Sequence, residues 1–150
     1  MTRRLAHDRR GVAAIEFAII GPVLLLMLGV MADISLAVAA QNRLAQAVAN
    51  AAQYAFGVGA TVNAGAVQAL VQSSTTLTGV VTVVTGPALY CAAGSPATLS
   101  ADPAGTVCAD GTLPGTYLKL VSHYTYTPLM PGISTMVSTN LQQSATVRLQ

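Results

Sequence analysis

The clearest pattern along the chain is an unbroken apolar run near its N-terminus. Val12 to Ala32 reads VAAIEFAIIGPVLLLMLGVMA and contains one charged residue, Glu16. At 1.5 Å per residue, a helix of this length spans about 31 Å, which matches the hydrocarbon core of a bilayer. The pattern therefore predicts a transmembrane helix over residues 12–33, with Asp33 marking its outer boundary.

The helical pattern continues beyond the apolar run. From Ile34 to Phe56 there is no glycine or proline, and alanine, leucine and glutamine are frequent. Polar and apolar positions alternate with the period of a helix that lies on a core. The polar face holds Asn42, Gln46, Asn50 and Gln53, and the apolar face holds Leu44, Val48, Ala51, Ala52 and Ala55. Gly57 and Gly59 are expected to end a rod about 68 Å long that runs from about Val12 to Phe56.

The rest of the chain predicts one short helix and a small sheet. Asn63 is a candidate N-cap for a helix over 64–72, with Val67, Leu70 and Val71 on its inner side. Later segments are β-branched or alternate in polarity, as half-buried strands do. They predict strands near 77–85, 117–126 and 144–149, allow a further short strand at Pro87–Cys91, and leave loops at 92–115 and 127–140. The expected fold class is α+β, a long N-terminal helix packed on a small antiparallel β-sheet.

Charge is scarce and unevenly distributed. Charged residues make up 8% of the chain, against roughly 25% in an ordinary soluble domain. This deficit favours a protein that resides in a membrane, in an assembly or in both. The formal net charge is +2; the first ten residues, with four arginines and Asp8, contribute +3 and leave −1 for the remainder. We expect no nucleic-acid binding, because the domain beyond the long helix has only Lys119 and Arg148 as cations.

The basic residues also predict an orientation in the membrane. The arginines that precede the apolar run are Arg3, Arg4, Arg9 and Arg10. By the positive-inside rule they keep the N-terminus in the cytoplasm and place residues 34–150 outside.

Two cysteines, Cys91 and Cys108, fall on the expected outer side. A pair in a small exported domain is most simply a disulfide, and closing that loop is worth about 3 kcal/mol in the chain-entropy model. Two unrelated buried thiols are the alternative. We expect no metal site, because no cluster of ligands surrounds either cysteine.

The junction between the leader and the apolar helix carries the most specific motif. It reads RRGVAAIEFA from Arg9 to Ala18, with a lone glutamate five residues after Gly11. Prepilin-like proteins share this arrangement, and G-V-A-A-I-E-F resembles the TadE-like minor pseudopilins of the tight-adherence (Tad/Flp) pilus system. HYTYTPLMPG (His123–Gly132) and SATVRL (Ser144–Leu149) are similar to the tyrosine-containing strand, Pro-Leu-x-Pro loop and terminal arginine-bearing strand of that family.

The resemblance implies a pilin-like fold and proteolytic processing. A membrane prepilin peptidase would cut between Gly11 and Val12, remove the leader 1–11 and create an α-ammonium on Val12. A carboxylate in hydrocarbon costs on the order of 2.5–3.5 kcal/mol, and pairing Glu16 with such an ammonium on a neighbouring subunit would offset that cost and set the axial register between helices. Glu16 and Phe17 are therefore the expected assembly residues. Alternatively, Glu16 simply snorkels to the headgroups.

The leading hypothesis is a minor pseudopilin that takes part in Tad/Flp pilus biogenesis and surface adhesion through helix–helix packing in the inner membrane. Its expected partners are the prepilin peptidase, other pilins or pseudopilins, the Tad assembly machinery and the lipid bilayer, with no cofactor and no small-molecule substrate. The domain would be periplasmic, or extracted into a pilus. The sequence does not separate a TadE-type from a TadF-type role, or a filament component from a cap or a base component.

Two other functions remain open. Met1–Ala39 could be a signal peptide cleaved from a secreted surface or binding protein, or the chain could be a plain single-span protein that keeps its leader. We do not expect an enzyme, since the sequence has no H-E-x-x-H, no G-x-S-x-G and no pair of carboxylates placed for acid–base work. His7 falls in the leader, and His123 is expected on the polar face of a strand.

Overall fold

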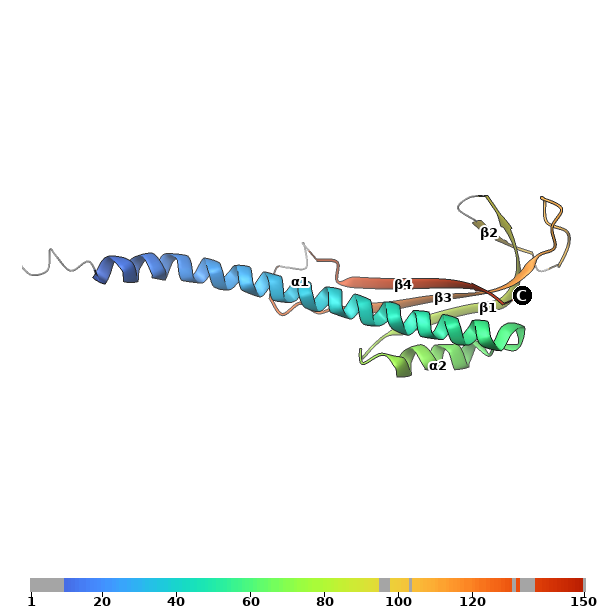
Figure 1. Ribbon diagram of the computed structural model, residues 1–150, viewed down its shortest axis with the longest axis horizontal. Helices are drawn as coiled ribbons and strands as arrows, with labels where there is room; N and C mark the ends of the chain where they lie inside the picture. The colour runs from blue at the N-terminus through green and yellow to red at the C-terminus, as the bar shows by residue number, and fades with distance from the viewer. Residues whose placement is uncertain (1–9, 95–97, 103, 131, 133–136, 150) are drawn as a thin grey trace, which may run out of the picture.

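The computed structural model describes residues 10–94, 98–102, 104–130, 132 and 137–149, without the side chain of Arg10. A helix of 49 residues, α1 (Arg10–Val58), extends along the whole molecule, and one half of it projects beyond the domain (Figure 1). The helix continues through Pro22. It ends two residues later than predicted, in a 3₁₀ turn (Gly59–Thr61) in which Gly59 adopts a φ of 74°.

A second helix, α2 (Ala64–Ser74), folds back along the end of α1. The side chain of Asn63 caps it by accepting hydrogen bonds from the amides of Gly65 (2.8 Å) and Ala66 (3.4 Å). Val67 and Val71 are fully buried, as the pattern predicts. The helix extends two residues beyond its predicted end at residue 72.

Four antiparallel strands form one sheet in the order β2-β1-β3-β4. They are β1 (Val81–Ala93), β2 (Thr98–Ala101), β3 (Gly115–Thr125) and β4 (Asn140–Arg148). Both helices pack on one face of this sheet (Figure 1). The α+β fold class expected from the sequence is confirmed.

Four expectations for the strands are wrong. The last strand begins at Asn140 rather than near residue 144, because Asn140 already pairs with Thr125 of β3. The first strand begins at Val81 rather than near residue 77, because Thr78 and Gly79 form a turn in which Gly79 has a φ of 84°. The possible separate strand at Pro87–Cys91 is the continuation of β1, whose register with β3 shifts between Thr85 and Ala88. The segment predicted as a loop from 92 to 115 contains β2, which pairs with the end of β1.

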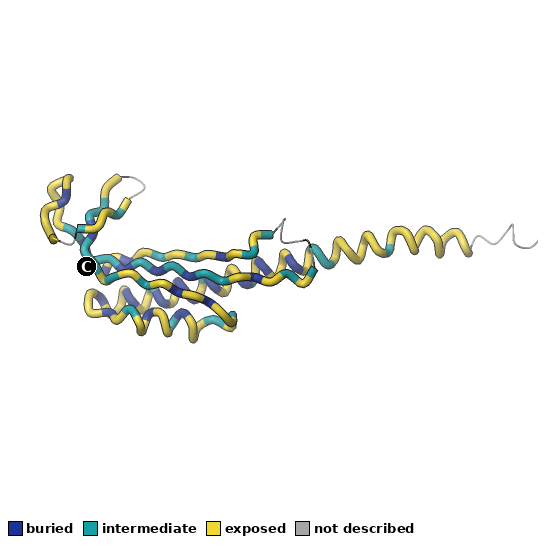
Figure 2. Tube along the Cα trace, turned by 180° about the vertical axis from the view of Figure 1, so that it is seen from behind, coloured by how far each residue is buried: buried dark blue, intermediate teal, exposed yellow. Residues whose placement is uncertain are grey.

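The core lies between the sheet and the second half of α1, where Figure 2 places the buried positions of the helix. Leu44 and Ala51 of α1 are completely buried and belong to the same hydrophobic cluster as Leu118 and Leu120 of β3. Asn42, Gln46, Asn50 and Gln53, which the sequence assigned to the polar face, are exposed. Alanine at most of the inward positions of α1 lets the helix lie close to the strands.

Candidate functional site

The residues of the predicted processing and assembly motif lie in the first turns of α1. Gly11, Val12, Glu16 and Phe17 are all exposed, and Phe17 keeps 74% of its surface accessible. A side chain at Gly11 would meet no other atom within 4 Å. Glu16 follows Val12 by about one helical turn and forms no hydrogen bond or ion pair within the described part of the chain. Arg3, Arg4 and Arg9 lie outside the described residues, as does the side chain of Arg10.

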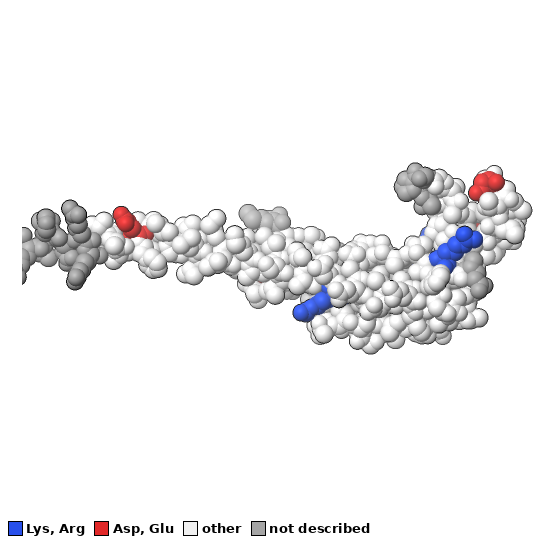
Figure 3. Space-filling model, viewed as in Figure 1, with Lys and Arg blue, Asp and Glu red and all other residues white. Residues whose placement is uncertain are grey.

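The first half of α1 presents an apolar surface that no other described residue covers. Residues 12–28 are exposed apart from the partly buried Gly21, and Figure 3 shows this half almost free of charge, with one acidic group near its N-terminal end. Among the described residues this is the one helix long and apolar enough to cross a membrane, with a mean hydropathy of 2.4 over its most apolar window. Only 17% of that window is buried, whereas a core helix of a soluble protein would be covered.

The structure reveals one site that the sequence did not predict as such. Asp33 is completely buried at the point where the exposed half of α1 meets the domain. Its carboxylate accepts hydrogen bonds from the Tyr126 hydroxyl (3.0 Å), the Leu129 amide (2.8 Å) and the Met130 amide (2.9 Å). The sequence alone predicts Asp33 only as a marker of the membrane boundary. These contacts make it the anchor that joins the loop after β3 to the helix.

The loop reaches Asp33 because of its local sequence. Pro128 follows the end of β3 and is followed by two successive amides, those of Leu129 and Met130, which both point at the carboxylate. The Tyr126 amide donates to the Thr139 carbonyl (2.7 Å) and holds the start of the loop. Burial and the neighbouring Asp33 raise the pKa of the Tyr126 hydroxyl, so the phenol stays protonated and remains a donor at neutral pH.

A second contact of the same loop lies one helical turn closer to the N-terminus. The side chain of Met130 packs directly over Gly29, where any side chain would collide with its sulfur atom. Gly29 belongs to the segment predicted to span the membrane. We call Gly29, Asp33, Tyr126, Leu129 and Met130 the boundary clasp.

At the far end of the domain, Cys91 and Cys108 form a disulfide with a Cα–Cα distance of 5.6 Å. It joins the end of β1 to the loop that precedes β3. In this loop Asp110 accepts hydrogen bonds from the hydroxyl (2.7 Å) and the amide (3.0 Å) of Thr112, and these bonds lower the pKa of Asp110.

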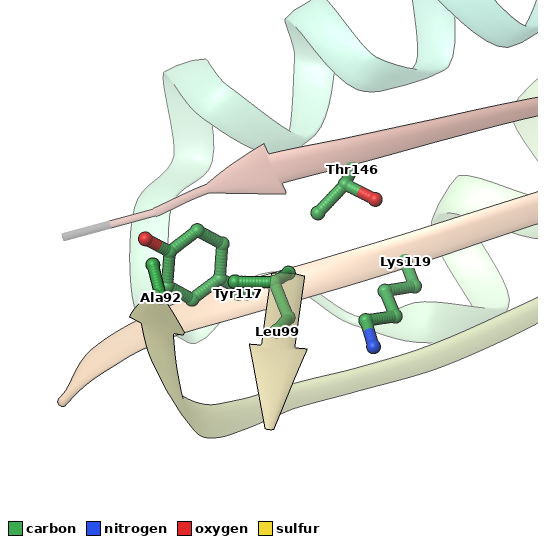
Figure 4. Close-up of a pocket in the computed structure, with 5 residues that line it drawn as sticks. All are labelled: Ala92, Leu99, Tyr117, Lys119 and Thr146. Atoms are coloured by element: carbon green, nitrogen blue, oxygen red, sulfur yellow. The ribbon is translucent and has the colours of Figure 1, made fainter. Parts of the chain in front are cut away.

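The strand pair β1–β2 bends over the outer face of the sheet and leaves a groove of about 420 Å³. Figure 4 shows Ala92 and Leu99 on the β1–β2 side and Lys119 and Thr146 on the sheet side. The Lys119 ammonium lies 4.2 Å from the centre of the Tyr90 ring, which it contacts through a cation–π interaction. Among the described lining residues there is no carboxylate or imidazole, so the groove offers no acid–base pair for catalysis.

No group of three residues suited to hold a metal ion occurs among the described residues. The processing motif and the disulfide, which the sequence predicts, lie apart in the structure, and the boundary clasp, which it does not predict, is separate from both. The processing motif and Glu16 are at one end of the rod, the disulfide is at the other end, and the boundary clasp lies between them (Figure 1).

In the comparison with protein families, residues 11–53 match the family described as TadE-like protein. No curated protein and no solved structure is significantly similar to the chain. The match begins at Gly11, includes Glu16 and Asp33, and ends within the part of α1 that packs on the sheet. It confirms the resemblance drawn from the sequence and points to a role in the Tad pilus system. Residues 11–53, most of the N-terminal helix, are therefore similar to the TadE-like family.

Proposed function

We propose that this protein is a minor pseudopilin of a Tad/Flp pilus, anchored in the inner membrane by the first half of α1 and taking part in pilus assembly and surface adhesion. One observation supports this most strongly: an exposed apolar half-helix that starts at Gly11 and carries Glu16 continues without a break into a packed domain. A protein of this shape can associate with other pilins through the helix while it holds its domain outside the membrane.

Processing and assembly follow from the first turns of α1. The peptidase cuts after Gly11, the arginine-rich leader is lost, and the new ammonium of Val12 becomes available. Because Glu16 has no partner within the described chain, its carboxylate is free to accept the ammonium of a neighbouring subunit. In hydrocarbon such a pair is favoured over two separate charges. The domain lies on the periplasmic side, where a disulfide such as Cys91–Cys108 is stable.

The fold argues against the secreted alternative. Cleavage after Ala39 would remove Asp33 and with it the three hydrogen bonds that hold the loop after β3. It would also remove Ala37, which is buried in the same core as Leu44. A signal peptide is discarded, so it should not supply core residues to the mature domain. An enzymatic role has no support either, since the TadE-like family is not known for enzymatic activity.

The mature N-terminus tests this proposal. Mass spectrometry of the protein from cells that contain the peptidase should find Val12 as the first residue, whereas Ala40 or an intact leader would contradict it. The variant Gly11→Leu should block cleavage without disturbing the fold, because space around Gly11 is open. Gly57→Leu is the matched control: a Cβ at Gly57 also meets nothing within 4 Å, but the residue lies outside the motif, so processing should be normal.

Glu16→Leu tests the assembly step. The variant should insert in the membrane and be processed, but its incorporation with other pilus components should be weakened or lost. Co-purification with sheared pili or with membrane-bound assembly components measures this. Normal assembly by the variant would contradict the role of Glu16 and leave membrane anchoring intact.

A further inference from the structure

The loop of the boundary clasp lies at the depth where the membrane must end. If Val12 lies at the inner boundary of the hydrocarbon, α1 reaches Asp33 after about 31 Å, the thickness of the hydrocarbon core. The Leu129 and Met130 amides bind Asp33 directly. Met130 packs over Gly29, which is about 6 Å closer to the bilayer centre than Asp33. The loop is thus held level with the outer edge of the hydrocarbon and partly below it.

The side chains exposed around this level are apolar. Leu129 keeps 74% of its surface accessible although its amide is tied to Asp33. On α1 itself, Ile34, Leu36 and Val38 are also exposed, and the first exposed run of polar residues begins only at Gln41. Ser35 is exposed, but its hydroxyl donates to the Met31 carbonyl (2.8 Å) and is therefore satisfied without water.

Asp33 does not conflict with a lipid environment at this level. It has no surface accessible to solvent or lipid, and its carboxylate is bound by two amides and a hydroxyl. A charged group that is buried and fully hydrogen-bonded does not require water. The exposed surface near Asp33 can therefore be apolar on all sides that face away from the domain.

A groove of about 210 Å³ lies between the loop and the helix. Leu129 and Leu36 line it, and it extends along α1 to Arg43, about two helical turns further from the membrane. A groove that opens beside a membrane-spanning helix, with a mainly apolar lining and an arginine at its far end, is suited to part of a lipid molecule.

We propose that the loop Thr127–Met130 and the exposed α1 residues Ile34, Leu36 and Val38 form a lipid-contact surface that rests in the boundary between acyl chains and headgroups of the outer leaflet. This inference depends on the membrane anchoring proposed above. The domain then has two attachments to the bilayer, the helix that spans it and the loop that rests on it. Because Asp33 joins the two, the domain holds one fixed height and one fixed orientation relative to the membrane.

Single tryptophan probes test the proposal, since the chain contains no tryptophan. Leu129→Trp places the probe in the loop. Leu28→Trp is the control inside the predicted span, at a residue 62% exposed, and Leu113→Trp is the control at the far end of the domain, at a residue 77% exposed. Leu113 precedes β3 and Leu129 follows it, so the length of this 11-residue strand, about 37 Å, separates the two positions. Leu36→Trp is a second probe of the surface in case the loop variant is poorly tolerated.

The four proteins are reconstituted in phosphatidylcholine vesicles with and without bromine atoms on the acyl chains, which quench tryptophan on contact. In the brominated vesicles we expect Leu28→Trp, Leu129→Trp and Leu36→Trp to lose a large part of their emission and Leu113→Trp to keep it. If Leu28→Trp is quenched while both surface probes behave like Leu113→Trp, the lipid-contact surface is refuted and the membrane anchor stands. If Leu28→Trp is not quenched, the anchor itself is refuted.

Discussion

Removal of the Tyr126 hydroxyl tests whether the boundary clasp holds the domain to its helix. Tyr126→Phe deletes one donor to Asp33, at 3.0 Å, and leaves the ring in the same buried position. The natural control is Tyr124→Phe, which deletes the same atom two residues earlier on β3, from a tyrosine that is partly buried and forms no side-chain hydrogen bond within the described residues.

A hydrogen bond to a charged acceptor contributes about 1.5–3 kcal/mol to stability. The hydroxyl bond of Tyr126 is one of three that satisfy the carboxylate, so its loss also leaves Asp33 with the two amide donors alone. For a chain of this size we expect the melting temperature of Tyr126→Phe to fall by roughly 4–10 °C. Tyr124→Phe should change the free energy of unfolding by no more than about 0.5 kcal/mol.

Thermal unfolding in detergent micelles, followed by circular dichroism, measures both variants. Hydrogen exchange adds a local measurement: the amides of Leu129 and Met130, which bind Asp33, should lose protection in Tyr126→Phe and keep it in Tyr124→Phe. Equal melting temperatures and equal protection in the two variants would refute the clasp as a stabilising contact.

Three further predictions follow from the domain. Replacing Cys91 and Cys108 together by serine should lower the free energy of unfolding by about 3 kcal/mol, because the disulfide closes a loop with a sequence separation of 17. Thermal unfolding with and without reductant measures this loss. Leu44→Ala should lower the free energy of unfolding by about 2–5 kcal/mol because Leu44 is completely buried. Leu36→Ala, at an exposed residue, should change it by no more than about 0.5 kcal/mol, and a denaturant titration measures both variants. Because the pKa of Tyr126 is raised, its contribution to stability should be complete below about pH 10 and decrease as the pH rises further, and Tyr126→Phe should reduce this decrease.

The helices could be predicted from the sequence because their signals are local. Leu44 and Ala51 follow the helical period and are buried, whereas Asn50 lies on the opposite face and is exposed. Asn63 precedes a short amphipathic segment and caps it as expected. In each case the residues that carry the pattern lie within a few turns of one another, and a single period describes them.

Asp33 could not be assigned in the same way, because its partners lie 93 to 97 residues away. A weaker signal was present. The carboxylate stands at the edge of an apolar run with no neighbouring cation, and a group in that position needs hydrogen-bond donors from elsewhere. The segment TPLMPG contains two successive backbone amides after a proline, those of Leu129 and Met130. The sequence alone does not show which acceptor these amides bind.

The distal part of the sheet depends on contacts between segments without strong patterns. β2 has four residues of mixed polarity and, among the described residues, pairs with the end of β1 alone, so no alternation revealed it. Gly86 lies at the point where the register of β1 with β3 shifts, between Thr85 and Ala88. A side chain at this position, which has a φ of 105°, would approach the Tyr117 carbonyl oxygen to 2.7 Å. The glycine permits the close approach of the two strands, and this requirement is visible only after the sheet is formed.

The unbroken course of α1 has a mechanical consequence. Its 49 residues carry the exposed apolar half, the attachment at Asp33 and the inward face of the core on one helix, which continues through Pro22 although this residue donates no backbone hydrogen bond. An axial pull or a rotation applied at one end is therefore transmitted along the helix to the other end. In a bundle of such helices, the packing angle chosen inside the bilayer would dictate how the folded heads are spaced and turned above it.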